Sequence, residues 1–66
     1  MEVIVNGESL KVAPGISVLE LLKHLTLDPA RVAVELDRHI IKASEWPKTG
    51  LSDGSKLEIV QFVGGG

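Results

Sequence analysis

The sequence has no cysteine and few aromatic residues, which make up 3% of the chain. Without cysteine the chain can form no disulfide, no thiolate nucleophile and no cysteine-based zinc site. Its two histidines, His24 and His39, are too few to suggest a metal cluster, and both are expected to be solvated side chains. We therefore expect no metal and no cofactor bound by this chain.

The sequence also lacks an excess of positive charge and any long apolar run. Its formal net charge is -2, which argues against nucleic acid as the main partner, because phosphate binding needs clustered lysines and arginines. The start, Met1-Glu2-Val3, has no basic region of a signal peptide, and no stretch is apolar enough to span a membrane. We expect a single small cytoplasmic domain that binds neither nucleic acid nor membrane.

A β-hairpin is predicted at the start of the chain. The β-branched run Val3 to Val5 is followed by Asn6-Gly7, the strongest short hairpin signal. The next segment, residues 8–12, alternates apolar and polar side chains. These features predict two antiparallel strands joined by a two-residue turn.

A helix is predicted over residues 16–25. Ser17 is the expected N-cap, and Glu20, three residues later, completes a capping box. The apolar residues follow the spacing i, i+3, i+4, i+7 of a single helical stripe, which consists of Val18, Leu21, Leu22 and Leu25. A helix with one apolar face needs a sheet or another helix to cover it.

The remaining segments predict further strands on the same sheet. Alternation indicates strands at residues 32–36 and 39–41, joined by a tight turn at Asp37-Arg38, and a last strand at residues 57–63. Between them, residues 43–47 look like a short helical turn stopped by Pro47, with Trp46 covering the core. The order predicts an α+β fold of the ubiquitin-like β-grasp type: a mixed sheet of four to five strands packed on one helix, in a domain of residues 1–62.

The last predicted strand has an unusual outer face. Leu57 and Ile59 fit the side that faces the helix, which leaves Val60 and Phe62 on the side that should be polar. Exposed apolar clusters tend to mark interaction sites, so these two residues are a candidate partner interface. The competing interpretation is a β-bulge that turns Phe62 back into the core.

The chain ends in a flexible tail of residues 63–66, Val63-Gly64-Gly65-Gly66. Fully extended, this strip reaches roughly 14 Å, and its glycines carry no side chains. The Gly66 carboxylate could therefore enter a narrow channel of a partner. The alternative interpretation is an ordinary frayed terminus.

Short motifs along the whole chain share one family pattern. They are Val3-Ile4-Val5-Asn6-Gly7, Val18-Leu19-Glu20-Leu21-Leu22, Val34-Glu35-Leu36, Asp53-Gly54, Glu58-Ile59-Val60 and Phe62-Val63-Gly64-Gly65-Gly66. With these motifs the sequence resembles the sulfur carrier proteins of thiamine biosynthesis, the ThiS family. It departs from many relatives at the second hairpin, which has Asp37-Arg38 instead of Asn-Gly; this affects turn geometry and not chemistry.

The resemblance implies a carrier and not an enzyme. It implies that an adenylating, E1-like enzyme uses ATP to convert the Gly66 carboxylate into an acyl-adenylate. Sulfur from a cysteine desulfurase system would then give a Gly66 thiocarboxylate, and thiazole synthase would take up that sulfur. Residues 63–65 would present Gly66 to these partners.

Three other functions remain open at this stage. One is a carrier like the small subunit of molybdopterin synthase, which has the same tail chemistry. Another is a ubiquitin-like modifier, in which Gly66 is joined to lysines of target proteins. The third is a β-grasp module that binds a ligand or RNA. The acidic net charge and the terminal glycines argue against this third function.

Overall fold

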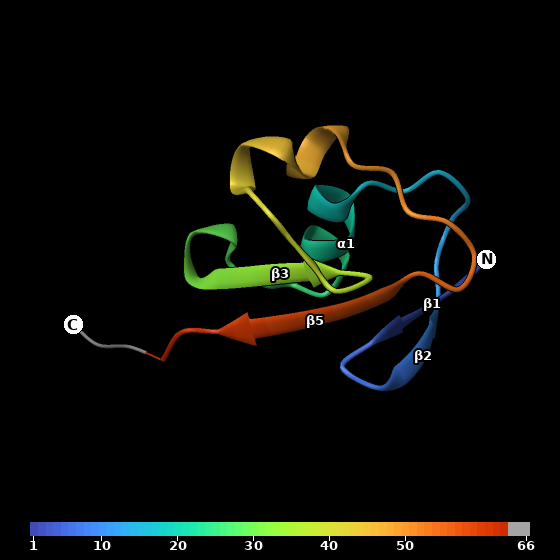
Figure 1. The fold of residues 1–66 in the computed structure, drawn as a ribbon, viewed down its shortest axis with the longest axis horizontal. Coiled ribbons are helices and arrows are strands. Elements are labelled where there is room, and N and C mark those ends of the chain that lie inside the picture. Colours follow the sequence, from blue (N-terminus) through green and yellow to red (C-terminus); the bar gives the residue numbers. More distant parts are fainter. Residues whose placement is uncertain (64–66) are drawn as a thin grey trace.

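A computed structural model describes residues 1–63 and shows one sheet with one α-helix packed on it (Figure 1). The order of elements is the predicted β-β-α-β-β-β, and the β-grasp fold is confirmed. Among the described residues, no helix is both long and apolar enough to cross a membrane. The elements are β1 (Glu2–Val5), β2 (Glu8–Lys11), α1 (Val18–His24), β3 (Val32–Leu36), β4 (His39–Ile41) and β5 (Lys56–Gln61), with two short 3₁₀ helices, η1 (Pro29–Arg31) and η2 (Ala43–Lys48).

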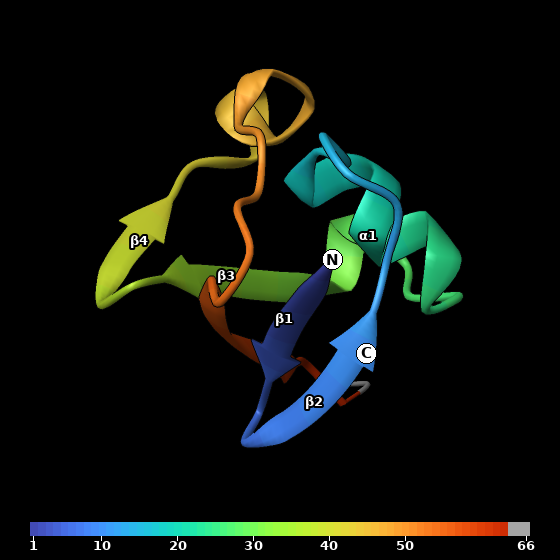
Figure 2. The same cartoon turned by 90° about the vertical axis from the view of Figure 1, so that its right-hand side faces the viewer.

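The five strands lie in the order β2-β1-β5-β3-β4 (Figure 2). β5 pairs in parallel with β1 and antiparallel with β3, so the last strand of the chain is the central strand of the sheet. A central strand is hydrogen-bonded along both edges, whereas an edge strand is bonded along one. The segment that leads into the C-terminal tail is therefore held by neighbouring strands on both sides.

Both hairpins have two-residue turns with left-handed backbone. Asn6 and Gly7 have φ values of 50° and 82°, and Asp37 and Arg38 have values of 47° and 73°. Positive φ at both central residues is the type I′ geometry, whose twist matches that of the strands. The prediction of both turns from the sequence is confirmed.

Helix α1 begins with the predicted capping box. The Ser17 hydroxyl accepts a hydrogen bond from the Glu20 backbone N–H at 3.1 Å, and the Ser17 N–H donates to the Glu20 carboxylate at 3.0 Å. The helix is shorter than the predicted 16–25, because Ser17 has an extended backbone and Leu25 is the C-cap. Two backbone bonds, Val18 N–H to the Thr49 carbonyl and Leu51 N–H to the Ile16 carbonyl, tie this start to the later chain.

The core lies between α1 and the inner face of the sheet. Trp46 is 4% exposed, and its indole N–H donates to the Ile41 carbonyl at 2.9 Å, so its predicted role in covering the core is confirmed. Pro47 does not stop η2, which continues to Lys48 in 3₁₀ geometry. The most completely buried side chains are Val3, Val18, Leu21, Leu22, Val34 and Leu57.

The last strand differs from the prediction at both ends. It runs over Lys56–Gln61 and not over 57–63, so it stops two residues earlier than expected. The reason is its partner: β3 begins at Val32, which lies opposite Gln61, and the residue before it, Arg31, belongs to η1, so the ladder of strand pairs ends there. Phe62 and Val63 therefore lie outside the strand.

Candidate functional site: the outer sheet face and the base of the tail

The position of β5 is fixed on one side by the Asn6 side chain. Its amide nitrogen donates to the Ile59 carbonyl at 3.0 Å, and its oxygen accepts from the Ile59 N–H at 2.7 Å. The parallel pairing of β1 with β5 ends at Val5 and Leu57, so the Asn6 amide continues the hydrogen bonding where the β1 backbone turns away. The sequence predicted Asn6 as a turn residue and missed this second role.

On its other side, β5 is held up to the point where the tail begins. The Phe62 N–H donates to the Arg31 carbonyl at 2.7 Å, directly after the Val32–Gln61 pair. Arg31, Gln61, Phe62 and Val63 line an open hollow of about 440 Å³ at this place. The base of the tail is thus anchored to η1, and Val63, at 96% exposure, is the first residue without this support.

The alternation along β5 places apolar side chains on the outer face of the sheet, the face turned away from α1. Leu57 and Ile59 are buried, whereas Val60 and Phe62 are 58% and 57% exposed. The register between β3 and β5 is continuous from Gln61 to Leu57, without the bulge that would turn Phe62 inward. The predicted exposure of both side chains is therefore correct, while their role as a partner interface stays a prediction.

The outer face also carries residues that sequence reasoning did not single out. Cross-strand register places Ile40 of β4 opposite Glu35 of β3, and Glu35 opposite Glu58 of β5. Ile40 is 81% exposed. Alternation alone could have put Glu35 on the outer face, but its neighbours follow only from the strand order. We call the five residues Ile40, Glu35, Glu58, Val60 and Phe62 the outer patch.

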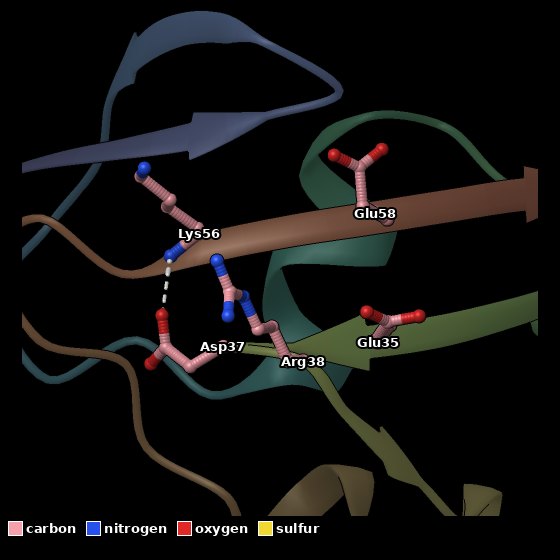
Figure 3. A pocket seen from close by; sticks show the side chains of 5 residues that line it. All are labelled: Glu35, Asp37, Arg38, Lys56 and Glu58. Atoms are coloured by element: carbon pink, nitrogen blue, oxygen red, sulfur yellow. Dashed lines mark hydrogen bonds between the residues drawn. The ribbon is translucent and has the colours of Figure 1, made fainter.

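A polar hollow borders the outer patch near the second hairpin turn (Figure 3). The Asp37 carboxylate accepts from the Lys56 N–H at 3.1 Å and so ties the turn to the start of β5. The hollow has a volume of about 390 Å³ and is lined by Glu35, Asp37, Arg38, Lys56 and Glu58.

The residues expected to carry the chemistry, Gly64, Gly65 and Gly66, lie outside the described residues, so their proposed roles stay predictions. What the structure contributes is the body that carries them. A sequence profile of the ThiS family matches residues 3–66.

The chain belongs to the ThiS family. The resemblance predicted from its sequence is thereby confirmed. The crystal structure of the thiamine biosynthesis protein ThiS from Geobacter metallireducens is similar over the whole of both chains, with a TM-score of 0.86 and 33% identity. The sulfur carrier protein ThiS of Escherichia coli (strain K12) is 27% identical over the full length of both chains.

A second kind of relative is much longer than this ThiS-family chain. The thiazole synthase of Paramagnetospirillum magneticum is 39% identical over 66 residues, which cover all of this chain and 20% of that protein. The chain therefore spans about a fifth of the length of this relative, which carries a ThiS-like region within a protein named for a synthase.

Proposed function

We propose that the chain is a sulfur carrier of thiamine biosynthesis and that Gly66 carries the sulfur. The observation that supports this most is the family match, which extends to Gly66 on a fold whose central strand leads directly into the tail. The carrier itself is a co-substrate and not an enzyme. It presents a carboxylate, and its partners perform the reactions.

The proposed chemistry converts the Gly66 carboxyl group in three steps. In the first, a Gly66 carboxylate oxygen attacks the α-phosphorus of ATP on an adenylating partner, and pyrophosphate leaves. In the second, the terminal sulfur of a persulfide on a cysteine desulfurase system attacks the acyl carbon, and AMP leaves with its electron pair, which gives an acyl disulfide. In the third, a thiol attacks the donor's sulfur in that S–S bond, so that a disulfide forms and the C-terminal sulfur leaves with the electron pair. The product is a thiocarboxylate. The chain has no cysteine that could hold a persulfide, so its terminus is the natural place for sulfur.

The acceptor that we propose is a thiazole synthase. The relative from P. magneticum supports this, because a region similar to the whole of this chain occurs there within a thiazole synthase. Two functions that act in sequence are often joined in one polypeptide. ATP-dependent adenylation also fits the cytoplasmic location expected from the sequence.

The body has a separate role in this proposal, which is to bind the adenylating enzyme. Val60 and Phe62 are exposed beside the tail, and apolar side chains at the centre of an interface contribute most of its binding energy. Anchoring at the outer face would leave the residues from Val63 onward free to reach the enzyme's ATP site.

The proposal is tested by changing the length of the tail. Deletion of Gly66 shortens the chain by about 3.5 Å, which is as large as the distance of roughly 3–3.5 Å needed for attack. Addition of an alanine after Gly66 makes the opposite error and places a Cβ beside the reacting carbon.

Both variants should fold and bind the adenylating enzyme but lose most ATP–pyrophosphate exchange and all thiocarboxylate formation. Unchanged thermal unfolding and unchanged affinity for the enzyme are the controls. Normal exchange by the Gly66 deletion would refute the carrier proposal.

A further inference from the structure

The first hairpin turn contains the only asparagine of the chain, and a glycine follows it directly. Asparagine is chemically labile, and a following glycine makes it more so, because no side chain shields the backbone nitrogen that attacks. The turn itself demands such a pair, since both central residues of a type I′ turn have positive φ. The residues that suit this turn best are therefore also those most prone to deamidation.

Deamidation of an Asn-Gly pair is a cyclisation followed by hydrolysis. The Gly7 backbone nitrogen attacks the side-chain carbon Cγ of Asn6 and gives up its proton, and the side-chain nitrogen leaves as ammonia with the electron pair of the broken C–N bond. The product is a five-membered succinimide ring. Water then adds to one of the two ring carbonyls, and the ring nitrogen leaves with its electron pair and takes up a proton. This opening gives aspartate or, when the chain continues through the side chain, isoaspartate.

The backbone of the folded turn keeps the two reacting atoms apart. The ring requires the Gly7 nitrogen and the Asn6 Cβ to lie on the same side of the bond between Cα and the carbonyl carbon. Asn6 has a φ of 50°, in the left-handed region, where ψ is about +30 to +60°. At such ψ values the Gly7 nitrogen lies nearly opposite Cβ. Ring closure therefore requires the Asn6–Gly7 peptide plane to rotate, which opens the turn.

The side chain of Asn6 is held in place as well. Its amide nitrogen donates to the Ile59 carbonyl at 3.0 Å, and its oxygen accepts from the Ile59 N–H at 2.7 Å. The Asn6 backbone N–H adds a third bond, to the Leu57 carbonyl at 2.8 Å. Rotation of Cγ toward Gly7 breaks both side-chain bonds. Because β5 is the central strand, these bonds persist as long as the first hairpin stays on the sheet.

We propose that Asn6 is a deamidation site that the fold protects, and that it reacts only when the first hairpin separates from β5. Either product weakens the contact with β5. Aspartate has no side-chain N–H for the Ile59 carbonyl and places a carboxylate oxygen against it, while isoaspartate adds a methylene group to the backbone of a two-residue turn. A molecule that has reacted while open is therefore less stable when it refolds.

The first experiment compares the full-length protein with a peptide of residues 1–11, the fragment that trypsin releases by cleavage after Lys11. Both are incubated in the same buffer at neutral pH, and mass spectrometry of residues 1–11 follows the replacement of the Asn6 amide by an acid. The folded protein should react at least about 100-fold more slowly than the peptide, because well under ~1% of its molecules are open at a time. Equal rates would overturn the inference.

The variant Leu57→Ala tests whether opening is the route to the reaction. Leu57 is 1% exposed and lies opposite Val5 in the pairing of β1 with β5, directly beside the turn. Its truncation should raise the rate of deamidation by at least about 10-fold, because it weakens the packing that holds the hairpin on β5. Ser44→Ala, on the exposed surface of η2, is the control and should react like the wild type. A Leu57→Ala protein that loses stability but deamidates at the wild-type rate would contradict the proposed route.

The variant Asn6→Asp reproduces one product and tests its effect on the fold. Its melting temperature should fall by roughly 5–15 °C, because the Ile59 carbonyl loses its donor and faces a charge instead. Ser44→Asp adds the same charge away from the turn and should stay within about 3 °C of the wild type. An unchanged melting temperature of Asn6→Asp would show that the Asn6 amide does not hold the hairpin on β5, and the inference would fail.

Discussion

At the scale of single residues, Arg38 has a backbone conformation that is unfavourable for a residue with a side chain. Its φ of 73° lies in the left-handed region, as does that of Asp37 before it. An L-residue with a side chain loses roughly 1–2 kcal/mol in that region. Asp37 offsets part of the loss, because its N–H donates to the Lys56 carbonyl at 2.8 Å and its carboxylate accepts from the Lys56 N–H at 3.1 Å.

Arg38→Gly should therefore stabilise the protein. The gain in free energy of unfolding should be about 0.5–1 kcal/mol, since the relieved strain exceeds the extra chain entropy that glycine loses on folding. Urea unfolding measures it. Arg38→Ala is the control, because it removes the charge but keeps the Cβ. An equal gain from Arg38→Ala would show that charge, and not backbone conformation, limits stability at this turn.

Asn6 shows what the sequence could not predict at this scale. Its place in an Asn-Gly turn follows from two neighbouring residues. Its two hydrogen bonds to Ile59 join positions 53 residues apart in the chain. They depend on the parallel pairing of β1 with β5, and no local pattern at Asn6 contains that information.

At the scale of elements, the capping box of α1 should make the stability of the protein depend on pH. The pKa of Glu20 is lowered from its ordinary value, chiefly by the hydrogen bond from the Ser17 backbone N–H, with smaller contributions from the Ser17 side chain and the charge of Lys23. A carboxylate whose pKa is lower in the folded state stabilises that state when it is ionised. The stabilisation is present above the unfolded pKa and is lost as the pH falls through the folded pKa.

Glu20→Gln should therefore lower the melting temperature at neutral pH, and the difference from the wild type should shrink once the pH falls below about 4.3, the ordinary pKa of glutamate. Thermal unfolding of both proteins over a pH series measures this. Glu45→Gln, which changes the charge outside the cap, should show no such trend. A difference that stays constant down to low pH would mean that the capping carboxylate does not titrate with folding.

The elements differ in how far the sequence determines them. α1 and both hairpins were predicted because their signals lie within a few residues: Ser17 with Glu20 at the cap, and the two central residues at each turn. The end of β5 was predicted too late, because it depends on where β3 begins. The Glu35–Glu58 pair required the register between two strands that are separated by β4 and η2 in the chain.

At the scale of the whole molecule, one face of β5 packs into the core and the opposite face carries exposed apolar side chains. β5 is held at the centre of the sheet, with Leu57 and Ile59 in the core, while Val60 and Phe62 are exposed on the opposite face. In Figure 1 the end of β5 and the N-terminus lie at opposite ends of the molecule. The exposed apolar side chains of the outer face therefore continue up to the base of the tail.

The double substitution Val60→Ser with Phe62→Ser should weaken binding to the adenylating enzyme by at least about 10-fold, because truncation of apolar residues central to an interface typically removes more than 1 kcal/mol. The domain should stay folded, since both side chains are more than half exposed. Circular dichroism provides that control, and Leu57→Ser, at a position 1% exposed, should unfold the protein. Unfolding of the double variant would show that both residues support the core.

Whether Gly66 carries sulfur is measured by the mass of the C-terminal fragment of the protein purified from cells. Cleavage after Lys56 gives a fragment of residues 57–66, which excludes Met1. This matters because oxidation of that methionine adds one oxygen and has the same nominal mass change as replacement of oxygen by sulfur.

A thiol-alkylating reagent makes the measurement specific, because the chain has no cysteine to react with it. If Gly66 carries sulfur, a population of the fragment should have one carboxylate oxygen replaced by sulfur and should take up one alkyl group on Gly66. That population should disappear in cells without the adenylating enzyme. A fragment that carries only the carboxylate, under conditions in which the cells make their own thiamine, would show that Gly66 does not carry sulfur.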